Sequence, residues 1–218
     1  MSDWLLLQLA DSAFPTGGFV HAGGVEAAAH LGAVKTVSEL EQFLRHSLEQ
    51  CAYATLPFVS AAGERHDEVE TLDRWYDATL SNHVANRASR SQGQALLMTT
   101  AGMAPAVGVL KQRLRKAATP THLAVVAGAV FHLLGLQRQA MRQLFLFQHL
   151  RGLISAAVRL NLVGPLEAQS VQARLAPLGD ALLTATDHVQ PDDACATAPL
   201  LDIWQAHQDR LYSRLFNT

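Results

Sequence analysis

The chain has 218 residues, 49% of them hydrophobic, and a formal net charge of −2. This length and composition allow one large buried core, so we expect a single domain over residues 1–218 that needs no disulfide staples. The cysteines are Cys51 and Cys195, far apart and outside any paired motif, which favours a reducing cytoplasm. No signal-peptide pattern opens the chain, and the apolar stretch 123–136 is too short to span a membrane, so no membrane contact is expected.

Charge is unevenly distributed along the sequence. Residues 78–166 carry ten Lys or Arg and no Asp or Glu, so the acids lie in the flanks. We expect flanking acids to fold back onto these bases, with a surface for an acidic partner as the alternative. Nucleic-acid binding is the least favoured use, because no aromatic residues interleave with the bases in a recognition motif.

The first distinctive segment is a glycine-rich loop at residues 11–26. Pro15 fixes its own φ, and four glycines permit positive φ or close backbone approach: Gly17, Gly18, Gly23 and Gly24. No phosphate-binding motif is present, so a nucleotide is not expected here. His21 is a candidate for a transient metal or partner contact, or else a hydrogen bonder that fixes the loop.

Apolar side chains then recur with helical spacing, and strand alternation is nearly absent, which predicts an all-α multi-helix bundle. Thr36 and Ser38 each precede a glutamate by three residues, the signature of a capping box. This capping box should begin a long helix, and Pro57 should kink that helix. The next helix, over residues 67–80, should keep its acids, Asp73 among them, largely on the outside.

Proline and glycine suggest the later helix boundaries. Thr119 and Pro120 read as the N-cap and first residue of an apolar helix that stops near Gly135. The following helix is expected over residues 137–161, ended by the pair Gly164–Pro165. Further boundaries are expected at Pro177 and Pro199, and a mobile loop at residues 189–199.

Two helices carry candidate binding faces. Arg87, Arg90 and Gln94 share one face of a helix, which is either a binding face or an ordinary solvated one. Its small-residue face should admit a neighbouring helix: Ala88, Ser91 and Ala95. A C-terminal helix over about residues 200–216 would either bind a partner or dock on its own core. Its expected apolar stripe is Trp204, His207, Leu211 and Leu215.

No residue pattern indicates an enzyme. Histidines and cysteines lack metal-ligand spacing, so no structural metal site is expected. The histidines in apolar segments are expected to be hydrogen-bonded core or interface residues: His122, His132 and His149. The serines lack a nucleophile elbow, and Cys51 lies on a core stripe, where a thiol is inert.

Four stretches together resemble the UreF family of urease accessory proteins. They are DSAFPTGGFVHAGGVE at residues 11–26, RASRSQGQALL at 87–97, RLNLVGPLEAQ at 159–169 and HQDRLYSRLF at 207–216, in the family's order. The one departure is Gln208, where the family pattern has an acid after the terminal histidine.

This resemblance implies an all-α homodimer that bridges the scaffold UreD, also called UreH, and the GTPase UreG during nickel delivery to apo-urease. It implies no stably bound cofactor, with nickel only in transit and GTP on the GTPase. The resemblance also allows two other roles, namely regulation of the GTPase and lining of a passage for nickel. The alternatives are a plain helical dimerisation or adaptor module and, less favoured, a metal-dependent helical enzyme. The candidate partner-binding residues are Pro15, Gly17, Gly18, His21, Gly23, Gly24, Glu26, Arg87, Arg90, His207, Arg210, Tyr212, Ser213, Arg214, Leu215 and Phe216.

Overall fold

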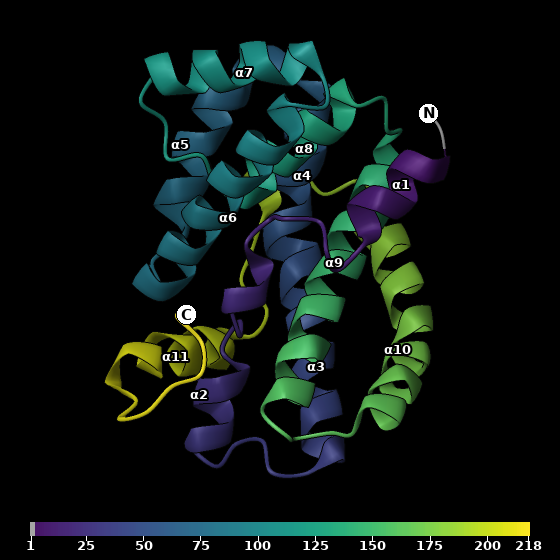
Figure 1. Ribbon diagram of the computed structural model, residues 1–218, viewed down its shortest axis with the longest axis vertical. Coiled ribbons are helices and arrows are strands. Elements are labelled where there is room, and N and C mark those ends of the chain that lie inside the picture. The colour runs from purple at the N-terminus through teal and green to yellow at the C-terminus, as the bar shows by residue number, and fades with distance from the viewer. Residues whose placement is uncertain (1–2) are drawn as a thin grey trace.

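A computed structural model describes residues 3–218 (Figure 1). Every regular element in this range is helical, which confirms the predicted all-α fold. The α-helices are α1 (Asp3–Ala10), α2 (Val25–His30), α3 (Val37–Gln50), α4 (Leu56–Glu64), α5 (Val69–Thr79), α6 (His83–Ala101), α7 (Pro105–Lys116), α8 (Leu123–Leu133), α9 (Arg138–Arg159), α10 (Pro165–Ala185) and α11 (Pro199–Ala206). The shorter helical turns are η1 (Gly18–Val20), η2 (Cys51–Thr55), η3 (His66–Glu68), η4 (Pro191–Asp193) and η5 (His207–Arg210). No helix among the described residues is long and apolar enough to cross a membrane.

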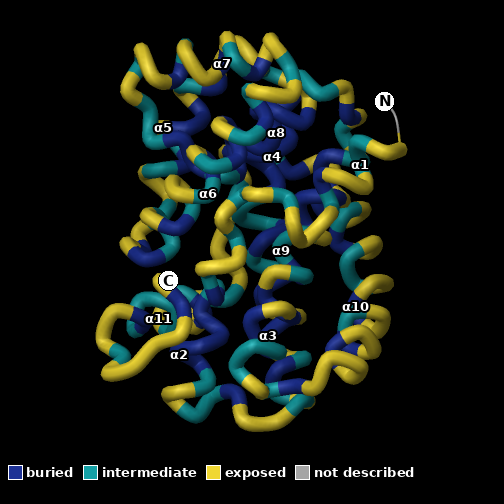
Figure 2. Tube along the Cα trace, viewed as in Figure 1, coloured by how far each residue is buried: buried dark blue, intermediate teal, exposed yellow. Residues whose placement is uncertain are grey.

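Helices α4 and α8 cross at the centre of the molecule, where both are buried (Figure 2). Glycine makes this approach possible. A Cβ built on Gly128 would lie 2.1 Å from the carbonyl oxygen of Val59, and one on Gly63 would lie 3.3 Å from the carbonyl oxygen of Gly128. The backbones therefore pack directly, and α9 and α10 extend the same apolar core to one side.

The start of α3 follows the predicted capping box. Thr36 Oγ1 accepts the backbone N–H of Glu39, and the Glu39 carboxylate accepts the N–H of Thr36. The disturbance expected at Pro57 is also found, because a π-helical turn at Cys51–Thr55 separates α3 from α4. Proline supplies no N–H, so the helix cannot continue with its ordinary hydrogen-bond ladder.

Two predictions are wrong for one reason: that Asp73 of α5 lies on the outside, and that Thr119 is the N-cap of α8. Asp73 is 1% exposed, and its carboxylate accepts the N–H groups of Thr121 at 2.6 Å and His122 at 2.8 Å. The buried acid thereby caps α8, whose N-cap is His122 rather than Thr119. Thr121 consequently takes a positive φ of 62° ahead of the helix.

The boundaries of α9 and α10 correct two predictions that were based on proline and glycine. Helix α8 does stop by Gly135, whose φ is 85°, and α9 fills the expected range. However, Asn161, at a φ of 56°, turns the chain out of α9, while Gly164 and Pro165 are the N-cap and first residue of α10. Pro177 lies inside α10 and not at a boundary.

The C-terminal helix is shorter than predicted. Pro199 begins α11 as expected, but the α-helix ends at Ala206, η5 follows, and Leu211 is already extended. The expected apolar stripe through Leu211 and Leu215 therefore does not form. Residues 189–199 contain only the short turn η4 before α11.

Helix α6 presents a different small face from the one expected. Ser91 is exposed, whereas Gly93 is buried, and a Cβ there would lie 2.0 Å from the carbonyl oxygen of Thr121. Ala88 is buried as predicted. Glycine, not serine, thus gives α6 its closest contact with the chain that enters α8.

The predicted folding-back of acids onto the basic stretch is confirmed at several points. Arg113 pairs with Glu70 at 2.6 Å, and Arg142 pairs with Asp187 at 2.7 Å. Among the described residues six bases of the stretch make no ion pair: Arg90, Lys111, Arg115, Lys116, Arg151 and Arg159.

The buried thiol and imidazoles largely match expectation. Cys51 is buried, and desolvation raises the pKa of its thiol to about 12. His122 is fully buried against Asp77 at 2.9 Å, and His149 hydrogen-bonds to Ser47 Oγ at 2.8 Å. His132 is instead exposed, so the core reading is wrong for that residue.

Candidate functional site

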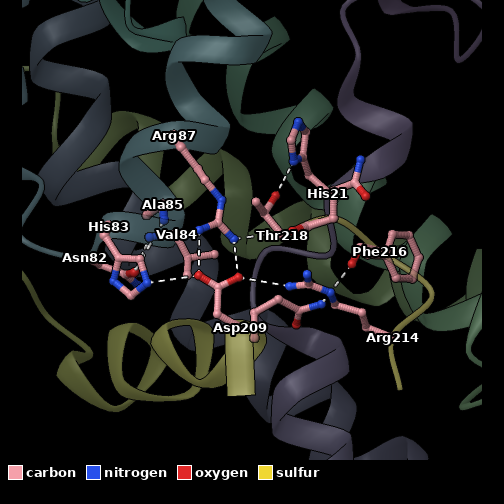
Figure 3. A network of polar contacts seen from close by, with 12 residues as sticks. His21, Asn82, His83, Val84, Ala85, Arg87, Asp209, Arg214, Phe216 and Thr218 are labelled. Atoms are coloured by element: carbon pink, nitrogen blue, oxygen red, sulfur yellow. Dashed lines mark hydrogen bonds and ion pairs between the residues drawn. The ribbon is translucent and has the colours of Figure 1, made fainter. Parts of the chain in front are cut away.

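Two segments from opposite ends of the sequence meet beside α6 and α9. We call residues 11–26 the glycine loop and residues 207–218 the tail. The N–H of Ala22 donates to the carbonyl of Thr218 at 2.6 Å, and the N–H of Asn217 donates to the carbonyl of Val20 at 3.0 Å. Two of the four family-like sequence stretches, at residues 11–26 and 207–216, form this junction (Figure 3).

Glycine is required in the loop by positive φ at some positions and by close packing at others. Gly17, Gly23 and Gly24 have φ values of 71°, 55° and 89°, a region that side chains rarely adopt. A Cβ on Gly23 would also lie 2.6 Å from Cδ2 of Leu153. Gly18 has no positive φ and no atom nearer than 3.5 Å to a built Cβ, so the special geometry expected of it is absent.

A buried carboxylate ties the tail to the start of α2. Glu26 is 1% exposed and accepts the N–H groups of Leu215 and Phe216, the latter at 3.1 Å. It also accepts Nε2 of Gln208 at 2.6 Å. Gln208 is fully buried, and an acid there would place two carboxylates against each other. Gln208 is therefore suited to this position, because its amide donates a hydrogen bond to Glu26 where an acid would repel it.

Asp209 joins the tail to α6 at the rim of the junction (Figure 3). Arg87 donates to both of its oxygens, at 2.6 and 2.5 Å, while Arg214 approaches at 2.9 Å and His83 at 3.1 Å. These donors, Arg87 first, hold the pKa of the Asp209 carboxyl far below its usual value. The same contact raises the pKa of Arg87. Asp209 and His83 were not among the predicted site residues.

Arg159 of α9 contacts both the glycine loop and the tail. The guanidinium of Arg159 lies 3.7 Å from the ring centroid of Phe19 and 4.3 Å from that of Phe216. Phe216 is 2% exposed and packs with Ala22 and Ala156 in a small apolar cluster. The tail is thus docked on its own chain, as the self-docking alternative predicted for this end.

His21 is a loop-fixing residue in this arrangement. Its Nδ1 hydrogen-bonds to Thr218 Oγ1, and its Nε2 is buried without a partner. Burial, with Arg87 nearby, lowers the pKa of the imidazole. Across residues 3–218 no cluster of three His, Cys, Asp or Glu side chains could hold a metal ion.

Several predicted site residues remain available at the surface of the junction. Tyr212 is fully exposed, Leu215 is 55% exposed, and Phe19 in the paired loop is 68% exposed. The other exposed members of the predicted set are Pro15, Gly17, Arg87, Arg90, Arg210, Ser213 and Arg214. His207 is half-buried and bonds to the carbonyl of Ile203. Arg90 is exposed on α6 but makes no contact with the junction.

Two cavities lie behind the glycine loop. The first has a volume of about 390 Å³ and is bordered by the acid Asp202, while the second, of about 510 Å³, is bordered by Arg151 and Arg159. His21 and His149 line both cavities. Burial lowers the pKa of His149 to about 4, so this interior imidazole is neutral near pH 7.

Comparison with known proteins points to one family. The family model described as UreF matches residues 34–176. "Urease accessory protein F" of Arabidopsis thaliana is 39% identical over 98% of this chain and 91% of that protein. Its namesake in Oryza sativa subsp. japonica is 36% identical, covering 99% and 85%. "Urease accessory protein UreF" of Mycobacterium tuberculosis (strain ATCC 25177 / H37Ra) is 33% identical, covering 95% of each chain.

Proposed function

The chain belongs to the UreF family of urease accessory proteins, and on this premise we propose that it acts in urease maturation as an adaptor. In the proposed role it joins a UreD/UreH-type scaffold to a UreG-type GTPase, so that nickel reaches apo-urease. It carries out no reaction of its own, and GTP stays on the GTPase. Its contribution is differential binding, because a protein that binds one arrangement of its partners more tightly shifts them toward it.

The observation that supports an adaptor is the exposed rim of the loop–tail junction. Tyr212, Leu215 and Phe19 present apolar area there, and Arg214 and Arg210 present forked donors beside it. Aromatic side chains and arginine are enriched at binding hot spots. The rim is held on a fixed frame by Glu26 and Arg87, so binding would not require the tail to be ordered first.

We further propose a homodimer located in the cytoplasm. Both cysteines are free thiols, as a reducing compartment requires. The side chain of Leu7 on α1, 64% exposed, presents apolar area to a second copy.

Co-purification with the scaffold and the GTPase tests the proposal. The double variant Tyr212→Ala, Leu215→Ala should keep its melting temperature yet lose capture of the scaffold, because both side chains are exposed in the isolated chain. Leu166→Ala, a truncation of an 88% exposed side chain on α10, should leave capture unchanged. Self-association without capture of either partner, by the unmodified chain, would favour the plain dimerisation module instead.

One observation favours a second role, as a wall of a nickel passage. His21 and His149 border two adjoining cavities, and burial lowers the pKa of both imidazoles, which keeps them in the neutral form that binds metals. His149→Phe should then slow nickel-dependent activation of urease in a reconstituted complex without changing complex assembly. Unchanged activation kinetics would exclude His149 from such a passage.

A further inference from the structure

The larger cavity has a cationic floor. Its wall on one side is the glycine loop, and on the other a face of α9 that carries Gln148, Arg151, Ser155 and Arg159 at helical spacing. No Asp or Glu lines this cavity of about 510 Å³. A cavity with two guanidinium groups and no acid on its walls has an uncompensated positive charge.

The two arginines differ from the other partly or fully buried arginines of residues 3–218. Each of the others has a carboxylate within 4.0 Å: Arg65, Arg113, Arg138 and Arg142. Arg151 and Arg159 are also partly buried, yet neither forms an ion pair. Desolvation lowers the pKa of Arg151, with the exposed Asp11 acting only from beyond ion-pair distance.

Most of their hydrogen-bonding capacity is unused. Arg151 Nη1 donates to the carbonyl of Ala10, just before the glycine loop, and Arg159 Nη1 donates to the carbonyl of Phe19 within the loop. A guanidinium has five N–H donors in a planar fork. The remaining donors have no hydrogen-bond partner among the described residues, and both arginines line the cavity.

We propose that this cavity binds a small carboxylate- or phosphate-bearing anion through Arg151 and Arg159. Guanidinium groups bind both kinds of oxyanion in paired, charge-assisted hydrogen bonds. Gln148 and Ser155 add neutral donors on the same face of α9. The site adjoins the exposed rim of the junction, because Phe19 also lines the cavity, but the inference does not rest on the role in urease maturation.

Thermal unfolding of the full chain tests the site, with inorganic phosphate and malonate as probes at an ionic strength matched with sodium chloride. Each anion that binds the folded state raises the melting temperature with a saturable dose dependence. Arg151→Gln should weaken that binding by about tenfold or more, since it removes a charged donor. Arg174→Gln, which removes an exposed arginine that pairs with Glu41, should not weaken it.

A second variant avoids disturbing the loop. Gly152 lines the cavity, and a Cβ built on it meets no atom within 4 Å. Gly152→Glu should place a carboxylate beside the arginines, raise the melting temperature without added anion and abolish the response to phosphate. Gly152→Gln has the same size without the charge and should keep the response. A melting temperature that responds to neither anion beyond the chloride control, or an equal response in the Glu and Gln variants, overturns the site.

Discussion

The α4–α8 crossing and the loop–tail junction are both tightly packed, but they are held together by different forces. At the crossing, Gly128 and Gly63 let two backbones meet within an apolar core. At the junction, Glu26, Asp209 and Arg159 fix the tail through hydrogen bonds, an ion pair and ring contacts. The crossing joins segments of one continuous core, whereas the junction joins residues about 190 positions apart, Glu26 and Phe216.

This difference predicts different sensitivities. Apolar packing depends on shape, so the crossing should respond to changes in volume and hardly to salt. Charged hydrogen bonds depend on protonation and screening, so the junction should respond to pH and ionic strength. It also predicts that the tail can come loose while the core remains folded.

The largest effect is expected from Gly128→Ala. The new methyl group would lie 2.1 Å from the carbonyl oxygen of Val59, and a backbone atom cannot move aside cheaply. We expect a loss of about 3 kcal/mol in the free energy of unfolding, measured with urea. Gly108→Ala on α7 meets no atom within 4 Å and should instead gain about 0.5–1 kcal/mol. Equal effects of the two variants would show that the crossing is not tightly packed.

The interior has a pH response of its own at His149. Burial lowers its pKa to about 4 from 6.5, so the unfolded state binds the proton more readily. Stability is therefore full above pH 6.5 and falls as the pH drops toward 4, by about 3 kcal/mol. His149→Gln should flatten the pH dependence of urea unfolding in this window. His132→Gln, at an exposed position, should retain it.

At the junction, Glu26→Gln should release the tail and leave the core intact. Two backbone N–H groups and the Gln208 amide lose a charged acceptor, which costs about 2 kcal/mol of tail docking. Hydrogen exchange at the amides of Leu215 and Phe216 should accelerate accordingly. Glu167→Gln, in the exposed first turn of α10, provides the control. Global unfolding by Glu26→Gln would show that the tail is part of the core and would break the comparison.

The smallest effect is expected at Asp209. Arg87 holds the pKa of this carboxyl far below its usual value, so its contribution is present above the ordinary aspartate range and is lost as the pH falls through the folded-state pKa. The pair is partly exposed, which limits its worth to about 1 kcal/mol or less. Asp209→Asn should remove the salt dependence of tail exchange, and Asp192→Asn should not.

The sequence predicts the helices well where the determinants are local. The capping box of Thr36 and Glu39 starts α3, and the missing N–H of Pro57 disturbs the helix, because both act within one or two turns. Asp73 shows the limit. Its position on the polar face of α5 is a local property, but its burial follows from a bond to Thr121, 48 positions later.

The candidate site shows the same division. The positive φ of Gly17 and Gly23 could be expected from a cluster of glycines, whereas the extended tail could not. Its residues have helical spacing, but Glu26 takes the N–H groups of Leu215 and Phe216 that a helix would use. Charge alone indicates that acids of the flanks meet the base-rich middle of the chain, but it does not single out Asp209 as the partner of Arg87.

The π-helical turn before Pro57 has a consequence for how the chain is tied together. A proline leaves the carbonyl four residues earlier without its helical donor, and here that carbonyl belongs to Tyr53. The N–H of Cys195 occupies it at 3.4 Å, from the segment that leads into α11. Because Pro57 has no N–H to donate, the carbonyl of Tyr53 is able to bind the segment that leads to the tail. Pro57→Ala would supply a rival donor to that carbonyl, and a change that strengthens the local helix would loosen a long-range connection.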